Sequence, residues 1–335
     1  MKKYKRRFLG ILAFSVFSLF SLGCSQKEGE VQDNLAEHVK LNSGAVLKSE
    51  DGGYNLYDYN DKYIKAENNK LILTYDKDSG SYVYINENNT FAIHGENEYK
   101  IEQKDYLNMK LSPKGKYISY FIDDNGMKMK VINIEENKEM KINSNVSISG
   151  TLYDWYDDKT LVYYGVSDEG INGLFLYDIE TNKEELLYKL KEGYVAYLKG
   201  TIDNILFLQL NFDNERQLVI LDKDTKDVEI LLEDVEEIKD VICVDSNVFF
   251  AGRVKDNVNS LYEINKGCAK RMVYDFPSVV DIEKGIKKDD SNNILFIGRN
   301  SQENGKEQVY IYSKDGSVSS ISDEASDYAF VEYIN

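Results

Sequence analysis

The chain has 335 residues, with 41 basic and 58 acidic side chains and a formal net charge of −17. So acidic a surface argues against nucleic acid or an anionic bilayer as the ligand, because both carry the same sign of charge. Cations, cationic peptides and neutral glycans remain compatible with this charge, which also helps to keep an exported protein soluble.

The first 24 residues have the pattern of an export signal. Basic residues before Phe8 precede an apolar run of about fifteen residues, Phe8 to Leu22, which is short for a membrane span of roughly twenty. The run ends in Gly23-Cys24, which resembles the lipobox of bacterial lipoproteins. That resemblance implies cleavage after residue 23 and lipidation of Cys24, with a diacylglyceryl thioether and further acylation such as palmitate. The alternative is an uncleaved membrane anchor with an unmodified cysteine.

The predicted organisation therefore has three parts. Residues 1–23 form a signal peptide, and residues 24–36 combine the lipidated cysteine with a polar, flexible tether. Residues 37–335 show no comparable break and are expected to form a single large domain. The predicted location is the extracytoplasmic face of the bacterial cell membrane, with the lipid on Cys24 as the membrane contact.

A repeated unit occupies the chain from about residue 62 onward. Its most apolar segment recurs every 43–46 residues, beginning at Leu71, Tyr117, Leu161, Ile205, Val248 and Ile294. A second apolar run follows each of these about a dozen residues later. Both kinds of run are too short for helices and are bounded by Asn, Asp and Gly, so they predict strands joined by tight turns. Four short antiparallel strands per repeat are typical of a β-propeller blade.

One turn in the repeat carries a family resemblance. Leu111-Ser-Pro-Lys-Gly-Lys-Tyr117 resembles the W-S-P-D-G-K turn of TolB-like and dipeptidyl-peptidase-type β-propellers, and Trp155 to Leu161 aligns with it. The resemblance implies an all-β propeller and gives Trp155 a packing role between blades. It carries no catalytic residue, because the peptidases of that group have a separate hydrolase domain.

The ends of the chain are predicted to close the ring. Tyr328–Ile334 has the character of an innermost strand without a blade of its own. Three candidate strands, His38–Leu41, Ala45–Lys48 and Tyr54–Tyr59, provide the outer part of that blade. Closure removes the two unpaired edges of an open ring, so seven blades are favoured over six.

Residues with catalytic chemistry are sparse. Two histidines, His38 and His94, are too few for a multi-histidine metal site, and no nucleophile elbow or phosphate-binding loop is present. Cys243 and Cys268 are predicted to stay unpaired, because an inner strand and a distal turn lie too far apart. The sequence predicts no catalytic residue, metal ligand or cofactor.

Several acidic segments are interpreted as turns. Asp157–Asp158 and Asp289–Asp290 occupy the same place in the repeat, just before an apolar strand. Asp76 to Gly80 resembles a calcium loop only faintly, since its glycine is one position early. We expect hairpin turns at all three segments.

Tyrosine is abundant, with 26 residues. Clusters near Tyr54 and Tyr57 and near Tyr153 and Tyr156 are candidate ligand-facing aromatics, because aromatic rings stack on sugars and peptides. The alternative is that these rings pack blade against blade, as strand residues commonly do.

These observations favour a monomeric binding module for a protein, peptide or envelope glycan, and not for nucleic acid. The alternative is an enzyme that acts on a glycan or peptide with carboxylates gathered on one propeller face.

Overall fold

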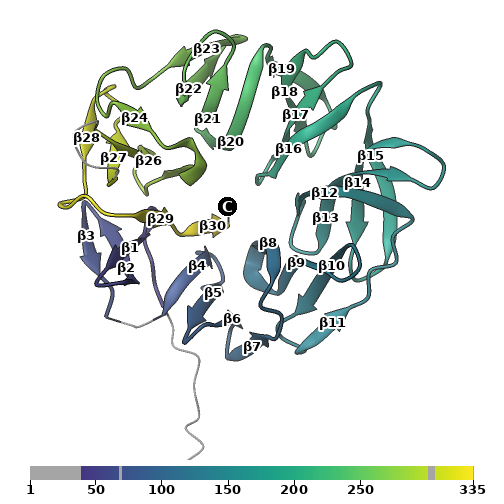
Figure 1. Cartoon of the computed structure of the whole chain (residues 1–335). Helices are drawn as coiled ribbons and strands as arrows, with labels where there is room; N and C mark the ends of the chain where they lie inside the picture. Colours follow the sequence, from purple (N-terminus) through teal and green to yellow (C-terminus); the bar gives the residue numbers. More distant parts are fainter. Residues whose placement is uncertain (1–38, 68–69, 301–305, 335) are drawn as a thin grey trace, which may run out of the picture. The chain divides into compact units, whose positions relative to one another are not determined.

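The computed structural model describes residues 39–67, 70–300 and 306–334. Within these residues, seven separate sheets are arranged like blades around one axis (Figure 1). The fold is an all-β propeller of mostly four-stranded antiparallel blades, and the prediction of seven blades is confirmed.

The blades are numbered here from the first in the sequence, and each is listed from the axis outward, except that β30, the innermost strand of blade 2, is described separately below. Blade 1 contains β29 (Tyr328–Phe330), β1 (Val46–Glu50), β2 (Gly53–Asn60) and β3 (Lys62–Lys65). Blade 2 contains β4 (Leu71–Asp76), β5 (Tyr82–Asn86), β6 (Asn89–His94) and β7 (Asn97–Ile101). Blade 3 contains β8 (Tyr106–Leu111), β9 (Tyr117–Asp123), β10 (Met127–Asn133) and β11 (Lys138–Met140). Blades 4 and 5 contain β12 (Val146–Trp155), β13 (Thr160–Ser167), β14 (Asn172–Asp178) and β15 (Lys183–Lys189); and β16 (Tyr194–Gly200), β17 (Asn204–Leu210), β18 (Arg216–Asp222) and β19 (Val228–Leu232).

Blades 6 and 7 complete the ring. Blade 6 contains β20 (Val235–Val244), β21 (Asn247–Val254), β22 (Ser260–Asn265) and β23 (Cys268–Arg271). Blade 7 contains β24 (Val279–Val280) and β25 (Ile286–Lys288) nearest the axis, followed by β26 (Ile294–Arg299), β27 (Gln308–Tyr312) and β28 (Val318–Ser320). Two 3₁₀ turns are present in the described chain: η1 (Pro113–Gly115) lies in the turn between β8 and β9, and η2 (Ile282–Lys284) lies between β24 and β25. The second of these divides the innermost strand of blade 7 into β24 and β25.

The antiparallel order gives the ring two different faces. We call the end at which the innermost strands begin the entry face; it carries the turns between the second and third strands and the connections between blades. The exit face is the opposite end and carries the remaining hairpin turns of each blade. The loops of the entry face are on average longer and more varied in length than those of the exit face. Binding and catalytic residues are often found on such surface loops.

The C-terminal segment closes the ring by joining two blades. β29 pairs antiparallel with β1, with Val46 opposite Phe330, and forms the innermost strand of blade 1. The following strand, β30 (Glu332–Ile334), pairs parallel with β4, with Glu332 opposite Thr74. In Figure 1 this yellow segment crosses from blade 1 to the axis beside β4.

Two details of the predicted closure need correction. Tyr328–Ile334 forms two strands on different blades rather than one. Of the three N-terminal candidates, only Ala45–Lys48 and Tyr54–Tyr59 correspond to strands; residues 39–41 have no strand, His38 lies outside the described residues, and Lys62–Lys65 is the third strand instead.

The repeat that begins at Leu71 is also offset from the others. Leu71 opens the first strand of its blade, whereas Tyr117 and Ile294 open second strands. The strand β4 is nevertheless second from the axis, because β30 lies inside it. Burial between β30 and β5 explains why its sequence is as apolar as that of a second strand.

The turn that resembles the TolB-like motif has a clear physical basis. Ser112 is fully buried, and its hydroxyl accepts a hydrogen bond of 3.0 Å from the Tyr117 backbone N–H. Gly115 has a φ of 70°, and a Cβ there would lie 2.1 Å from the Cβ of Ser81 in the neighbouring blade. The glycine therefore allows the exit-face turns of blades 2 and 3 to touch.

The core lies between the blades, as shown by Trp155. This side chain is only 4% exposed, and its ring stacks on Tyr117 of blade 3 with a centroid separation of 6.2 Å. Both belong to one apolar cluster formed by blades 3 and 4. The predicted role of Trp155 in blade-to-blade packing is confirmed.

Candidate functional site: the entry face and its arginine pocket

Exposed apolar side chains are concentrated on the entry face. Large apolar residues exposed there come from six of the seven blades and from the connection before blade 7: Tyr54, Leu107, Met127, Val166, Tyr194, Phe212, Val258, Tyr274, Phe276 and Val279. Among the described residues, the exit-face turns expose only Ile202 of this kind, and the others lie on outermost strands. Scattered apolar residues are normal on a surface, but this one-sided distribution distinguishes the entry face.

Arginine has the same one-sided distribution. After Arg7 the sequence contains four arginines, Arg216, Arg253, Arg271 and Arg299. All four lie at strand ends on the entry face of blades 5 to 7, whereas lysines occur on every blade. Arginine differs from lysine in presenting a planar, bidentate donor that fits carboxylates and phosphates.

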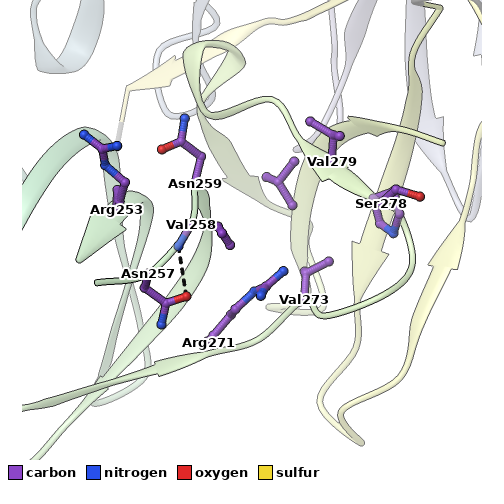
Figure 2. Close-up of a pocket in the computed structure, with 10 residues that line it drawn as sticks. Arg253, Asn257, Val258, Asn259, Arg271, Val273, Ser278 and Val279 are labelled. Carbon is purple, nitrogen blue, oxygen red and sulfur yellow. Dashed lines mark hydrogen bonds between the residues drawn. The ribbon is translucent and has the colours of Figure 1, made fainter. Parts of the chain in front are cut away.

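Two of these arginines line a pocket of about 470 Å³ between blades 6 and 7 (Figure 2). The polar residues of its lining are Arg253, Asn257, Asn259, Arg271 and Ser278. Its apolar wall consists of Val258, Val273, Pro277, Val279 and Val280. The loop between β21 and β22 and the connection from β23 to β24 supply most of both sets.

The two arginines have different surroundings. Arg253 forms an ion pair of 2.8 Å with Glu236, and in Figure 2 its guanidinium points away from the pocket. Arg271 is half-buried, and its guanidinium points into the pocket. Its Nε donates to the Ser260 hydroxyl at 3.4 Å and its Nη2 to the Tyr274 carbonyl at 3.1 Å. In the described part of the chain, Arg271 forms no ion pair with a carboxylate.

Six charged residues alternate in sign around the axis. They lie on the innermost strands of successive blades and on β30: Lys110, Asp154, Lys199, Asp240, Lys287 and Glu332. The ion pairs Lys110–Asp154 (3.0 Å), Lys199–Asp240 (2.5 Å), Lys287–Asp240 (3.2 Å) and Lys287–Glu332 (2.6 Å) link neighbouring strands. We call this set the axial charge ring.

Asp240 lies between two lysines of the axial charge ring, Lys199 and Lys287. Its burial alone raises the pKa, but the ammonium groups of Lys199 and Lys287 outweigh burial and hold the pKa of Asp240 well below its usual range. Each charge in this ring already has a partner, so the ring links blades and offers no unpaired charge to a ligand.

A second acidic group lies on the entry face between blades 7 and 1. Glu307 is 7% exposed, and burial together with a hydrogen bond to Asp281 raises its pKa to about 7. Lys284 lies 3.6 Å from its carboxylate and 2.7 Å from that of Asp327. A carboxyl that titrates near neutrality is a feature of functional sites, although structural networks also produce it.

The four tyrosines predicted to face a ligand are not brought together. Tyr54 is exposed on the entry face of blade 1, and its hydroxyl donates to Asp327. Tyr57 is half-buried and donates to Glu50 at 2.6 Å. Tyr156 lies on the exit face, where the ammonium groups of Lys223 and Lys226 each lie 4.8 Å from its ring centre.

The prediction that Tyr153 faces a ligand is wrong. Its side chain is 1% exposed and packs against Phe121 of blade 3. Its hydroxyl donates to the Asn108 carbonyl at 2.6 Å. Tyr153 therefore contributes to the core, which was the alternative interpretation.

The acidic segments form turns, as predicted. The Asp157 carboxylate accepts backbone hydrogen bonds from residues 159 and 160, at 2.9 and 2.7 Å, and that of Asp289 accepts from residues 291 and 293, at 2.9 and 2.8 Å. Asp76 accepts from the Ser79 hydroxyl at 2.7 Å inside the β4–β5 hairpin. Across residues 39–67, 70–300 and 306–334, no group of three or more His, Cys, Asp or Glu residues is placed to hold a metal ion.

The cysteines behave as expected where the structure describes them. Cys243 is half-buried on β20, Cys268 is exposed on β23, and both are free. Cys24 and the signal segment lie outside the described residues, as does His38. No helix within the described ranges is long and apolar enough to cross a membrane.

The arginine pocket was missed from the sequence. Arg253 and Arg271 lie 18 positions apart in one repeat, and neither belongs to a motif. The available signal in the sequence was the scarcity of arginine beside abundant lysine.

No protein-family model and no curated protein matches the sequence. Solved structures do match in fold. A prolyl endopeptidase structure matches with a TM-score of 0.55 and 10% identity over 84% of this chain and 51% of the other. An oligogalacturonate lyase in complex with manganese matches with a TM-score of 0.51 and 11% identity over 85% of each chain. TolB from Acinetobacter baumannii has a TM-score of 0.45, 13% identity, and coverage of 86% and 82%.

The expected resemblance to peptidase-type β-propellers is confirmed as a resemblance of fold by the prolyl endopeptidase match. At these levels of identity the likeness extends to the β-propeller architecture alone. The matched proteins include enzymes, so the fold does not decide between binding and catalysis.

Proposed function

We propose that this protein is a lipid-anchored extracytoplasmic binding module whose entry face binds a segment of another envelope protein. The observation that carries the proposal is the coincidence of exposed apolar side chains and all four propeller arginines on one face. Interface cores are enriched in aromatic residues and arginine and depleted in lysine and acidic residues. The entry face of blades 5 to 7 shares the arginines and exposed aromatic residues of such interfaces, although its loops also carry acidic residues such as Asp213, Glu233 and Asp256.

The position of the first described residues is compatible with the proposed use of the entry face. The described chain begins on the exit face, where Tyr75, at the end of β4, donates to the Val39 carbonyl at 3.1 Å. Lys77 and Asp290 form an ion pair of 2.6 Å beside it. The first described residues therefore pack on the exit face and not on the entry face.

The test is co-purification of the full chain with its envelope partner in mild detergent. Phe212 and Tyr274 are 78% and 61% exposed on the entry face, and Ile202 is 69% exposed on the exit face. Phe212→Asp and Tyr274→Asp should each reduce the recovered partner, because a carboxylate in an apolar contact is costly to desolvate. Ile202→Asp is the matched control and should not. Equal recovery with all three variants would contradict the proposal.

An enzyme is the second candidate, and Glu307 is the observation that favours it. A carboxyl with a pKa near 7 can act as a general acid at neutral pH, and Asp281 and Asp327 lie close to it. Glu307→Gln would abolish a glycan- or peptide-cleaving activity of the full chain while leaving partner binding intact. Absence of cleavage by the unmodified protein on envelope glycans and peptides would leave the binding function as the better account.

A further inference from the structure

We propose that the pocket between blades 6 and 7 binds the carboxyl-terminal residue of a peptide with an aliphatic side chain. This inference rests on the proposed binding function of the entry face and names the chemistry of one contact within it. The argument starts from Arg271, the one pocket arginine whose guanidinium points into the cavity (Figure 2).

Arg271 is held in place by uncharged groups of the described chain. Two of its N–H groups are committed to the Ser260 hydroxyl and the Tyr274 carbonyl, both of them uncharged acceptors. The Tyr274 ring centre lies 5.3 Å from the guanidinium carbon and supports it from one side. Arg253, by contrast, has Glu236 as a counter-ion at 2.8 Å.

Among the described residues Arg271 has no counter-ion, which is unusual for a half-buried cation in a chain with 58 acidic residues. Partly desolvated charges are costly unless they are paired. The fixed guanidinium, with its remaining donors, is therefore suited to an anionic group supplied by a ligand. Arginine binds carboxylates in a bidentate geometry that lysine does not reproduce.

The apolar wall specifies more than an anion. Val258, Val273, Pro277, Val279 and Val280 line the same cavity of about 470 Å³ as Arg271. An inorganic anion would gain no binding free energy from this apolar wall, because the anion has no apolar surface to bury. A ligand that satisfies both features carries a carboxylate and an aliphatic group close together.

The terminal residue of a peptide has this combination, since its carboxylate and its side chain share one Cα. The exposed amides of Asn257 and Asn259 at the pocket provide donors and acceptors for a peptide backbone. Asn257 already accepts from the Val258 N–H at 2.9 Å, which orients its amide and leaves its NH₂ as a donor. An acidic glycan is disfavoured, because sugars stack on aromatic rings and the pocket lining contains none.

The experiment measures binding of short labelled peptides to the detergent-solubilised full chain by fluorescence anisotropy. The probes are Ala-Ala-Val-Leu with a free carboxyl terminus, the same peptide as its amide, an amidated peptide with an internal glutamate, and an oligouronate. The free acid should bind about ten- to a hundred-fold more tightly than the amide, which is the range for a hydrogen bond to a charged group. Equal binding of acid and amide would refute the proposal without any variant being made.

Variants test whether the pocket is responsible. Arg271→Gln should weaken binding of the free acid by the same factor and leave binding of the amide unchanged. Arg253→Gln is the matched control and should have little effect, because Glu236 already neutralises Arg253. Val258→Asp should abolish selection of the free acid by placing a negative charge beside Arg271.

Other outcomes separate this proposal from the broader one. Tighter binding of the internal glutamate peptide or of the oligouronate would show that the carboxylate comes from another source, and would overturn the inference. If no peptide binds while Phe212→Asp still removes the envelope partner, only the pocket proposal fails. If both fail, the entry face is not the binding surface.

Discussion

Removing the C-terminal strands should open the ring. Tyr328, Val331 and Tyr333 are 2%, 0% and 8% exposed, respectively, and they pack against blades 1, 2 and 7. Burial of each large apolar side chain contributes about 1.5–3 kcal/mol, so the three together contribute about 5–9 kcal/mol. That is most of the stability of a typical domain, which is about 5–15 kcal/mol.

Deletion of residues 326–335 also leaves the inner edges of β1 and β4 without partners. Unpaired edges beside newly exposed apolar surface promote association. The truncated protein should therefore aggregate in size-exclusion chromatography or melt at a much lower temperature than the full chain. Removal of residues 25–34, in the predicted tether, is the control and should change little. A monomeric truncated protein with unaltered melting would show that the C-terminal strands close nothing.

The remaining predictions concern single residues. Trp155→Ala should lower the free energy of unfolding, measured by denaturant titration, by about 3–5 kcal/mol. The fluorescence of Trp155, the sole tryptophan, should be blue-shifted in the native protein. A native spectrum like that of tryptophan in water would contradict the packing role. Glu307 has a pKa raised from 4.5 to about 7, so the stability it contributes is present below pH 4.5 and is lost as the pH rises through 7. Glu307→Gln should accordingly raise the melting temperature at pH 8.5 and leave it nearly unchanged at pH 4.5, with the exposed Glu135→Gln as control; a rise of equal size at both pH values would contradict this. Cys24→Ala should leave an unprocessed precursor that incorporates no labelled fatty acid, and unchanged labelling would refute lipidation.

The repeat made the fold predictable from the sequence. A propeller blade is a local unit, so its strands and turns recur in the sequence at the period with which they recur in space. The exception at Leu71 follows from a contact that is not local. β30 comes from the far end of the chain and covers β4, which gives β4 the apolar composition of a second strand.

The surface was much less predictable. Tyr153 and Tyr54 have the same residue type and similar neighbours in the sequence, yet one is 1% exposed and the other 41%. Which face of a strand packs on the next blade depends on the twist and register of both blades, and the β12–β13 ladder shifts register between Ile148 and Tyr153. Arg271 joins Val258 and Val279 only because blades 6 and 7 meet, which residue order does not express.

The central claim, that the entry face receives a protein partner, is tested most directly by site-specific photo-crosslinking in living cells. A benzophenone amino acid is placed in the full chain at Phe212 or at Ile202, two residues of blade 5 that are 78% and 69% exposed on opposite faces. The account predicts a discrete adduct of higher mass from Phe212 and none from Ile202. An adduct from Ile202 alone, equal adducts from both positions, or none from either would contradict it.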